Sequence, residues 1–355
     1  MSSLAKRRTI AVVTGTRAEY GLLVPVMRAV EDRRELSLRV IVAGAHLVTG
    51  TWRDIKFEIA AKVTMQKRGR TGRAADVEAL SRGIIGFGKA FDTIKPDFVV
   101  VLGDRIEAFA AASVASVGGM RVGHIHGGDR AEGVADEAMR HAISKLAHVH
   151  FAATAQSRSR LIRMGERNVH RTGSPAVDGL LDVKAATDAP AVIVLQHPTG
   201  APDAQEATWM RQTLAATKSY TRLVMSPNTD PGAAGIGRVL PSDAVYHLPR
   251  ARWLSTLAGA KAIVGNSSAG LIEAAVLKTP CVNIGPRQAG REKPANVIDC
   301  DYGEANVRRA LAKALKLDLR RMRHPYGDGR AGGRIAELLS KFPLDKITIR
   351  KHNAY

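Results

Sequence analysis

The segment TIAVVTGTRAEYGLLVPVMRAV (residues 9–30) is the clearest indication of the fold class. Its first six residues are mostly apolar or β-branched, as in a strand that is buried on both faces. A glycine turn, GTRAEYG, follows, and apolar residues then recur at helical spacing at Leu22, Leu23, Val26, Met27 and Val30. A buried strand that runs through a tight turn into a helix is the repeating unit of parallel α/β sheets.

The same alternation continues along the chain. Further strands are predicted at 38–43, 97–102, 120–125 and 149–153, and, after a polar break at 182–190, at 191–196, 221–225, 261–265 and 280–285. We therefore predict an α/β fold of two doubly wound, Rossmann-like domains, 1–185 and 186–355, the second of which binds a nucleotide. A closing helix at about 330–340 is expected to pack back towards the first domain. Because ligands of open α/β sheets bind at the carboxyl ends of the strands, we expect both domains to face one crevice there.

The composition bounds the class of protein. A chain of 355 residues corresponds to about two domains. The net charge of +20 suggests a polyanionic partner, but the surplus is even: 28 basic minus 18 acidic residues in 1–180, and 25 minus 15 in 181–355, give +10 each. With only 5% aromatic residues and no zinc-finger spacing, we expect no nucleic-acid partner and regard most of the charge as solvated surface.

No apolar run approaches the ~18 residues of a membrane span, and the apolar segment at 9–14 is too short for a secretory signal. We therefore expect a cytoplasmic protein without a membrane partner. Cys281 and Cys300 are then reduced thiols, and Cys281 lies in an apolar run that is typical of a core position rather than a nucleophile.

Two motifs in the first half follow predicted strands. The turn GTRAEYG (15–21) offers backbone N–H groups and Arg17 to an anion, although a plain turn with a surface arginine explains it equally well. Asp104, in GDRIE (103–107), suits either the N-cap of a helix or acid–base work at the sheet edge.

The densest cluster of chemical groups is HIHGGDRAEGVADEAMRH (124–141). Carboxylates crowded into a cleft repel one another, so one of them can become a neutral proton donor. The acidic positions do not have the alternate spacing of a hard-cation loop, so we expect no metal. Asp136 and Glu137 could also simply open a helix. The cluster contains His126, Asp129, Glu132, Asp136 and Glu137.

Three motifs follow strands in the second half. His197 comes directly after AVIVLQ, where a histidine can titrate near neutral pH. In KAIVGNSSAGLIEA (261–274), the serines and helix N–H groups form a candidate diphosphate cradle, and Glu273 is placed to accept from a ribose. Ser267 as a hydrolytic nucleophile is disfavoured because the GxSxG elbow is missing. The loop NIGPRQAGRE (283–292) is either an anionic-ligand lid or a solvated basic loop.

Taken in order from about residue 10 to 300, these motifs resemble the hydrolysing UDP-N-acetylglucosamine 2-epimerases. The residues that carry the resemblance are TGTRAEYGLL, GDRIEA, HIHGG, ADEAMRHAISKLAHVHF, TGSPAVD, QHP, SPNTDPG, VGNSSAGLIEA and NIGPRQAGR followed by VIDC. The resemblance implies a fold of the glycosyltransferase-B type. It also implies anti elimination of UDP from the sugar to give a glycal, which is hydrated at C1 with inversion at C2. The products would be N-acetylmannosamine and UDP, for sialic-acid-type sugar synthesis.

The resemblance also assigns roles. It implies proton transfer by Asp104, His197 and a carboxylate of the 129–137 segment, which leaves Asp129, Asp136 and Glu137 as candidates. It implies no cofactor and no metal, and we expect a homodimer or homotetramer. The substrate-binding residues would be Arg17, His46, His126, Asn266, Ser267, Ser268, Glu273, Arg287, Gln288 and Arg291.

One position departs from the family pattern. Asp129 stands where the family usually has Glu after Gly-Gly, and the carboxylate is one methylene shorter. Misplacement on that scale affects catalysis, so the departure also fits another substrate, a UDP- or GDP-linked 2,4-diacetamido-trideoxy sugar. A glycosyltransferase of the same fold is the alternative from another class. The sequence leaves open which carboxylate is the general base.

Overall fold

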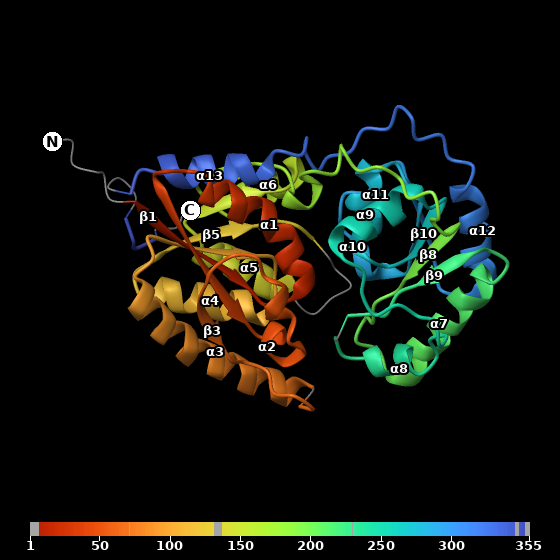
Figure 1. Cartoon of the computed structure of the whole chain (residues 1–355), viewed down its shortest axis with the longest axis horizontal. Coiled ribbons are helices and arrows are strands. Elements are labelled where there is room, and N and C mark those ends of the chain that lie inside the picture. Colours follow the sequence, from red (N-terminus) through yellow and green to blue (C-terminus); the bar gives the residue numbers. More distant parts are fainter. Residues whose placement is uncertain (1–6, 71, 131–136, 229, 345–347, 352–355) are drawn as a thin grey trace. The chain divides into compact units, whose positions relative to one another are not determined.

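The computed structural model describes residues 7–70, 72–130, 137–228, 230–344 and 348–351. The chain forms two compact units (Figure 1). The first contains the described residues of 1–129, 136–178 and 327–355, and the second contains those of 179–326 together with Arg130. The chain therefore leaves the first unit after Asp178 and returns to it after Tyr326, whereas the sequence suggested one boundary at 185/186.

The first unit is built on a seven-stranded parallel sheet of order β3-β2-β1-β4-β5-β6-β7. Its strands are β1 (Arg8–Thr14), β2 (Leu36–Ala43), β3 (Ile59–Val63), β4 (Phe98–Leu102), β5 (Arg121–Ile125), β6 (Val149–Ala152) and β7 (Val169–Arg171). Its helices are α1 (Arg17–Glu31), α2 (Ala45–Thr49), α3 (Arg73–Ile94), α4 (Ile106–Val117), α5 (Glu137–Leu146), α6 (Ala155–Arg163) and α13 (Ala331–Lys341).

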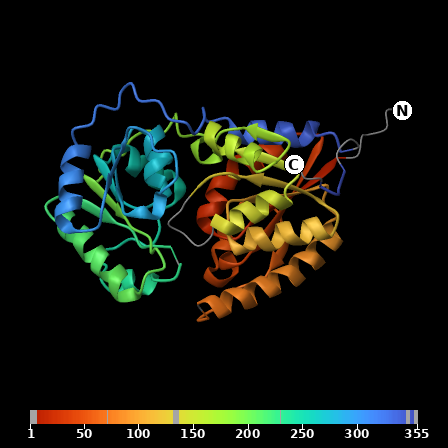
Figure 2. The ribbon, with the colours of Figure 1, turned by 180° about the vertical axis from the view of Figure 1, so that it is seen from behind.

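Two layers of helices cover this sheet. Helices α1 and α13 pack on one face and α3, α4 and α5 on the other, as Figure 2 shows from behind. Gly332 lets α13 approach α1, because a Cβ there would lie 2.5 Å from the Pro25 carbonyl oxygen. Asp178 accepts hydrogen bonds from the Ala331 and Gly332 amides at 2.9 and 2.7 Å. This packing is why residues 327–355 belong to the first unit.

A buried ionic cluster fixes the end of the described chain to α5. The Glu166 side chain is only 1% exposed and contacts Lys145 at 3.0 Å, His150 at 3.1 Å and Lys351. Lys351 also donates to the carbonyls of Ser144 and Lys145 at 3.0 and 2.8 Å. Segment 348–351 therefore caps the carboxyl end of α5 with a cation, which a helix terminus favours.

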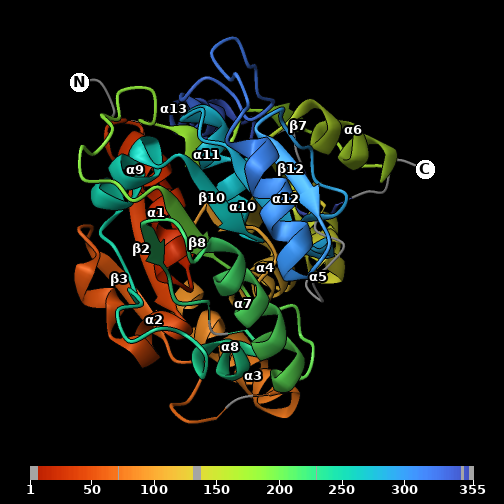
Figure 3. The same ribbon diagram turned by 90° about the vertical axis from the view of Figure 1, so that its right-hand side faces the viewer.

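The second unit contains a five-stranded parallel sheet of order β12-β11-β10-β8-β9. Figure 3 shows α7 and α12 over one face of it. The strands are β8 (Val192–Leu195), β9 (Arg222–Val224), β10 (Ala262–Gly265), β11 (Cys281–Ile284) and β12 (Val297–Cys300). The helices are α7 (Asp203–Thr217), α8 (Ala233–Gly237), α9 (Arg250–Gly259), α10 (Ser268–Leu271), α11 (Glu273–Val276) and α12 (Glu304–Ala314).

The predicted α/β class is confirmed, and all nine predicted strands are present within one or two residues of their expected limits. Cys281 is buried, as expected of a core residue, and burial raises the pKa of its thiol. None of the helices in the described ranges is both long enough and apolar enough to cross a lipid bilayer.

Candidate active site

The predicted residues of the first unit follow the carboxyl ends of β1, β2, β4 and β5. These strands are consecutive in the sheet, in the order β2-β1-β4-β5. Some backbone amides of the turn between β1 and α1 already donate to side chains of the same segment. The Gly15 amide donates to Glu19 Oε2 at 2.6 Å, and the Thr16 hydroxyl caps α1 by accepting from the Glu19 amide at 3.3 Å. Arg17 is half-exposed and pairs with Asp54 at 3.2 Å, so its charge stays accessible at this edge.

His46 lies fully buried behind the same turn. Its Nε2 is 3.1 Å from the Thr14 hydroxyl and its Nδ1 is 2.8 Å from the Thr51 hydroxyl. Burial lowers the pKa of the imidazole to about 4. His46 is therefore neutral at physiological pH and is fixed by two hydroxyl groups.

Sequence reasoning did not single out two buried carboxyls beneath this edge, Glu19 and Glu107. Glu107 is fully buried and accepts hydrogen bonds from Gln66 Nε2 at 2.9 Å and Arg105 Nε at 3.3 Å. Its side chain needs the space beside Gly15, where a Cβ would lie 2.7 Å from Glu107 Cγ. Burial raises the pKa of Glu19 to about 7. Glu19 lies in GTRAEYG (15–21) and Glu107 in GDRIE (103–107), but no sequence pattern distinguishes either from an ordinary helix residue.

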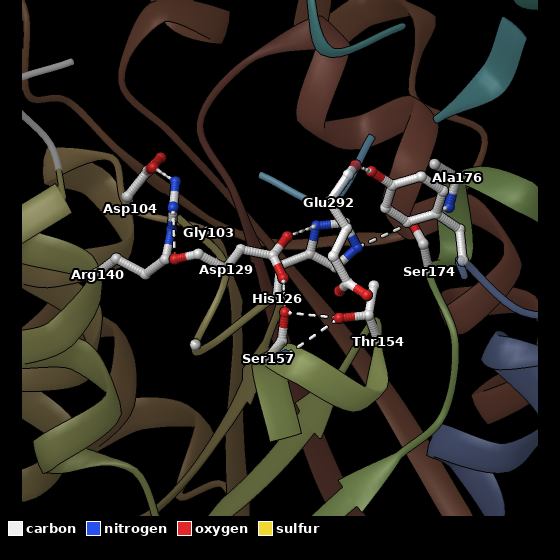
Figure 4. A network of polar contacts seen from close by, with 12 residues as sticks. Gly103, Asp104, His126, Asp129, Arg140, Thr154, Ser157, Ser174, Ala176 and Glu292 are labelled. Carbon is white, nitrogen blue, oxygen red and sulfur yellow. Dashed lines mark hydrogen bonds and ion pairs between the residues drawn. The ribbon is translucent and has the colours of Figure 1, made fainter. Parts of the chain in front are cut away.

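Asp104 follows β4 and forms an ion pair with Arg140 of α5 (Figure 4). The interpretation of Asp104 as a helix cap is wrong, because Arg105 occupies the cap position of α4 and no side chain bonds there. Arg140 is only 4% exposed, and its Nη1 also donates to the Asp129 carbonyl at 3.0 Å. This arginine was not predicted. It holds Asp104 and the backbone of Asp129 together.

His126 and Asp129 form a buried pair after β5 (Figure 4). His126 has a φ of 64°, a conformation that is costly for a residue with a side chain and is found at functional sites. Its Nδ1 lies 3.5 Å from Asp129 Oδ2, and its Nε2 lies 2.9 Å from the Ser174 hydroxyl. The Ser157 hydroxyl donates to Asp129 Oδ1 at 2.7 Å. The Asp129 carboxylate, one methylene closer to the backbone than that of a glutamate, is thus held by His126 and Ser157.

The remaining acidic candidates differ in what the structure says of them. Glu137 begins α5 and lies 3.5 Å from His141, which fits the expectation that it opens a helix. Asp136, predicted as catalytic, and Glu132 lie outside the described residues. Within the described ranges no group of three or more histidine, cysteine or acidic side chains could hold a metal ion.

In the second unit, His197 follows β8 and is held by Asn266. The His197 amide donates to Asn266 Oδ1 at 2.6 Å, and Asn266 Nδ2 donates to the His197 carbonyl at 2.8 Å. The Asn228 amide donates to His197 Nδ1 at 3.1 Å, so the ring proton is on Nε2. The expectation that His197 titrates near neutral pH is wrong, because burial and the nearby Arg287 lower the pKa of its imidazole to about 3.

Asn266 also ties the cradle to the loop after β11. Its carbonyl accepts from Gln288 Nε2 at 2.9 Å and from Arg287 Nη1 at 3.4 Å. Arg287 lies 3.8 Å from Asp230 as well. The structure therefore brings His197, Asn266, Arg287 and Gln288 together.

The serine turn after β10 differs from the expected single helix. Ser267 caps the short α10 by accepting from the Ala269 amide at 3.4 Å, and the helix breaks at Ile272 before α11. Gly265 adopts a φ of 148° and lies so close to the backbone of Leu195 that a Cβ at this position would collide with it. The Glu273 carboxylate accepts from Trp253 Nε1 at 2.8 Å and pairs with Arg250. A ribose bound to Glu273 as predicted would therefore share the carboxylate with Trp253 and Arg250.

A family model described as UDP-N-acetylglucosamine 2-epimerase matches residues 28–340. The chain belongs to this epimerase family. The match confirms the resemblance drawn from the motifs.

Two relatives from this family align with most of the chain. A protein of Legionella pneumophila named UDP-N,N'-diacetylbacillosamine 2-epimerase (hydrolyzing) is 33% identical over 98% of this chain and 100% of its own length. A UDP-N-acetylglucosamine 2-epimerase of Neisseria meningitidis is 31% identical over 87% of this chain and 88% of its own length.

Solved epimerase structures share the fold. A UDP-GlcNAc 2-epimerase from Neisseria meningitidis bound to UDP-GlcNAc has a TM-score of 0.79 at 19% identity and covers 94% of this chain and 100% of its own. A Methanocaldococcus jannaschii UDP-GlcNAc 2-epimerase in complex with UDP-GlcNAc and UDP has a TM-score of 0.76 at 19% identity and covers 94% and 99%. The predicted glycosyltransferase-B type of fold is thereby confirmed.

Proposed function

We propose that this epimerase is a hydrolysing enzyme that releases UDP from a UDP-linked 2-acetamido sugar and sets free the sugar with inverted configuration at C2. The observation that carries the proposal is the Asp104–Arg140–Asp129 arrangement, in which one buried guanidinium binds a carboxylate and the backbone of a second acidic residue. Epimerisation at C2 requires a proton to leave one face of the sugar and another to arrive on the opposite face. Two positioned carboxylates on separate segments suit that requirement.

In the first unit, Asp104 and Asp129 are the proposed proton-transfer groups, with Glu137 and Asp136 as further candidates. His126 and Ser157 orient Asp129, since both of its carboxylate oxygens have partners. Arg140 keeps the Asp104 carboxylate in place as the C2 proton moves. The free sugar product would serve sialic-acid-type sugar synthesis.

In the second unit, the proposed task is to bind the diphosphate that departs. A leaving diphosphate is stabilised by fixed donors and positive charge. His197 is neutral and donates through Nε2–H, so we assign it a hydrogen-bonding role toward the leaving group rather than that of a base. The other proposed ligand-binding groups of the second unit are Asn266, Ser267, Ser268, Glu273, Arg287, Gln288 and Arg291, and those of the first unit are Arg17 and His46.

For the sugar we propose UDP-N,N'-diacetylbacillosamine. A relative that aligns with all of its own length carries this substrate in its name, and Asp129 departs from the glutamate usual in the family. UDP-N-acetylglucosamine is the second candidate, because the Neisseria relative is named for it. Location in the cytoplasm and assembly into a homodimer or homotetramer stay predictions, and light scattering after size exclusion tests the assembly.

The test is a panel of UDP-N,N'-diacetylbacillosamine, its GDP-linked form and UDP-N-acetylglucosamine, with products identified by NMR. The proposal predicts UDP and a free 2-epimerised sugar, with the highest kcat/KM for the diacetamido substrate. If only UDP-N-acetylglucosamine is turned over, the proposed substrate is wrong and the proposed reaction still holds. Transfer of the sugar to an acceptor without free product would indicate a glycosyltransferase instead.

A further inference from the structure

The first unit has a groove of about 480 Å³ that lies between α6, β7 and α13, and of its lining residues only Thr172 belongs to a motif that carries the family resemblance. Figure 3 shows β7 and α6 next to each other at this side of the unit. The charged or titratable residues that line the groove are Arg158, His170, Arg171, Arg334, Glu337 and Lys341. A volume of this size accommodates a small molecule.

The groove is formed by elements whose opposite sides are buried. Ile335 and Leu339 of α13 pack into the core, and Leu338 packs partly against it, whereas the spacing of Arg334 and Lys341 places these two on a different side of the helix. β7 is an edge strand of the sheet, so no neighbouring strand covers its outer edge. The groove is thus a fixed feature of ordered elements.

The charges in the groove do not balance. Arg334 pairs with Asp328 at 2.6 Å, and Lys341 pairs with Glu337 at 2.6 Å. Arg158 donates through Nε to the Val169 carbonyl at 3.2 Å, which is not a charge partner. Within the described residues, the structure gives neither Arg158 nor Arg171 a carboxylate. The four cationic side chains that line the groove, the lining carboxylate of Glu337 and the Asp328 carboxylate that pairs with Arg334 together carry a charge of +2.

His170 adds no charge to this sum in the unliganded protein. Burial and the neighbouring Arg158 lower the pKa of its imidazole, so the ring is neutral at physiological pH. It remains available as a hydrogen-bond donor to an anion. Val169 and Leu338 supply an apolar surface beside these polar groups.

We propose that this groove binds a small soluble phosphate monoester as a dianion, at a site separate from the one that binds the nucleotide sugar. The dianion matches the unbalanced charge, and guanidinium groups bind phosphate oxygens in pairs. The apolar residues contact the organic part of the ligand. The groove lies wholly in the first unit, whereas the proposed diphosphate cradle is in the second.

The test uses the full chain, saturated with UDP, and titrates it with inorganic phosphate and glycerol 3-phosphate at constant ionic strength by calorimetry. We expect binding despite the UDP. Arg171→Gln should weaken it about three- to fivefold, the size of an exposed charge contact. Glu337→Gln should strengthen it by a similar factor, because removing the carboxylate raises the local charge; a misfolded variant would not bind more tightly.

The matched control is Arg163→Gln, an exposed arginine of α6 that does not line the groove, and it should leave the affinity unchanged. Vesicles containing phosphatidic acid should not sediment the protein more than neutral vesicles do. The proposal is overturned if UDP abolishes phosphate binding, if neither ester nor phosphate binds, or if Arg171→Gln and Glu337→Gln bind like the unaltered protein. Binding to the vesicles alone would identify a lipid headgroup as the ligand instead.

Discussion

Glu19 is a buried acid whose ionisation should set the pH dependence of stability. The residue is 6% exposed, and burial raises the pKa of its carboxyl from 4.5 to about 7, with further repulsion from Glu107, although the Gly15 amide bond opposes the change. In the unfolded chain the group ionises near 4.5. Between pH 4.5 and 7 the folded state therefore binds more protons than the unfolded state, and stability falls as the pH rises.

The magnitude follows from the two pKa values. A difference between 4.5 and about 7 corresponds to about 3 kcal/mol of stability lost at pH 8, and about 1 kcal/mol at pH 5. Glu19→Gln keeps an oxygen that accepts from the Gly15 amide and removes the charge. We expect the variant to be more stable than the unaltered protein by up to about 3 kcal/mol at pH 8 and by much less at pH 5.

The assay is urea unfolding of both proteins by circular dichroism at pH 5, 6, 7 and 8. Glu31→Gln, an exposed position on the same helix, is the control and should have little effect at any pH. A Glu19→Gln variant that is destabilised at pH 8, or whose advantage is the same at every pH, would refute the reasoning.

Four other substitutions separate the roles in the structure. Asp104→Asn should reduce kcat strongly and leave UDP affinity largely intact by calorimetry, whereas lost UDP binding would mean that its role is assigned wrongly. His197→Ala should also reduce kcat while UDP still binds, and kcat of the unaltered enzyme should show no ionisation of this residue between pH 5 and 9. Ser268→Ala should weaken UDP about fivefold, since one hydrogen bond of roughly 1 kcal/mol is lost and backbone donors remain; an unchanged Kd would remove Ser268 from the site. Burial raises the pKa of Glu166, but its basic partners outweigh this and lower it to about 2, so Glu166→Gln should cost about 3 kcal/mol above pH 5 and about 2 at pH 3.5, as urea unfolding would show.

The sequence predicted the interior of both sheets and the edge strand β9, but it missed the other three edge strands. β3, β7 and β12 were not predicted, and each is an edge strand. An edge strand needs fewer apolar residues, because one of its sides has no neighbouring strand. β7 is only three residues long and β3 contains Lys62, so neither has the continuous apolar run that marks a central strand such as β4.

The sequence predicted that the site residues follow strands, but it did not predict the hydrogen bonds and ion pairs between them. Arg140 lies in a helix where arginine is common, and only the fold brings it to Asp104. The break of the expected helix at Ile272 carries no proline signal. The neutral state of His197 depends on its burial and on Arg287, which is far away in the sequence. These properties depend on the folded structure, and the spacing of apolar residues along the sequence does not reveal them.

In the proposed reaction the enzyme removes and replaces the proton at C2 while it expels UDP. The most direct measurement is proton NMR of the reaction with the preferred nucleotide sugar in deuterated water. We expect UDP and a free sugar with inverted C2 that carries deuterium at that carbon. A released sugar that keeps its original C2 proton and configuration would contradict it.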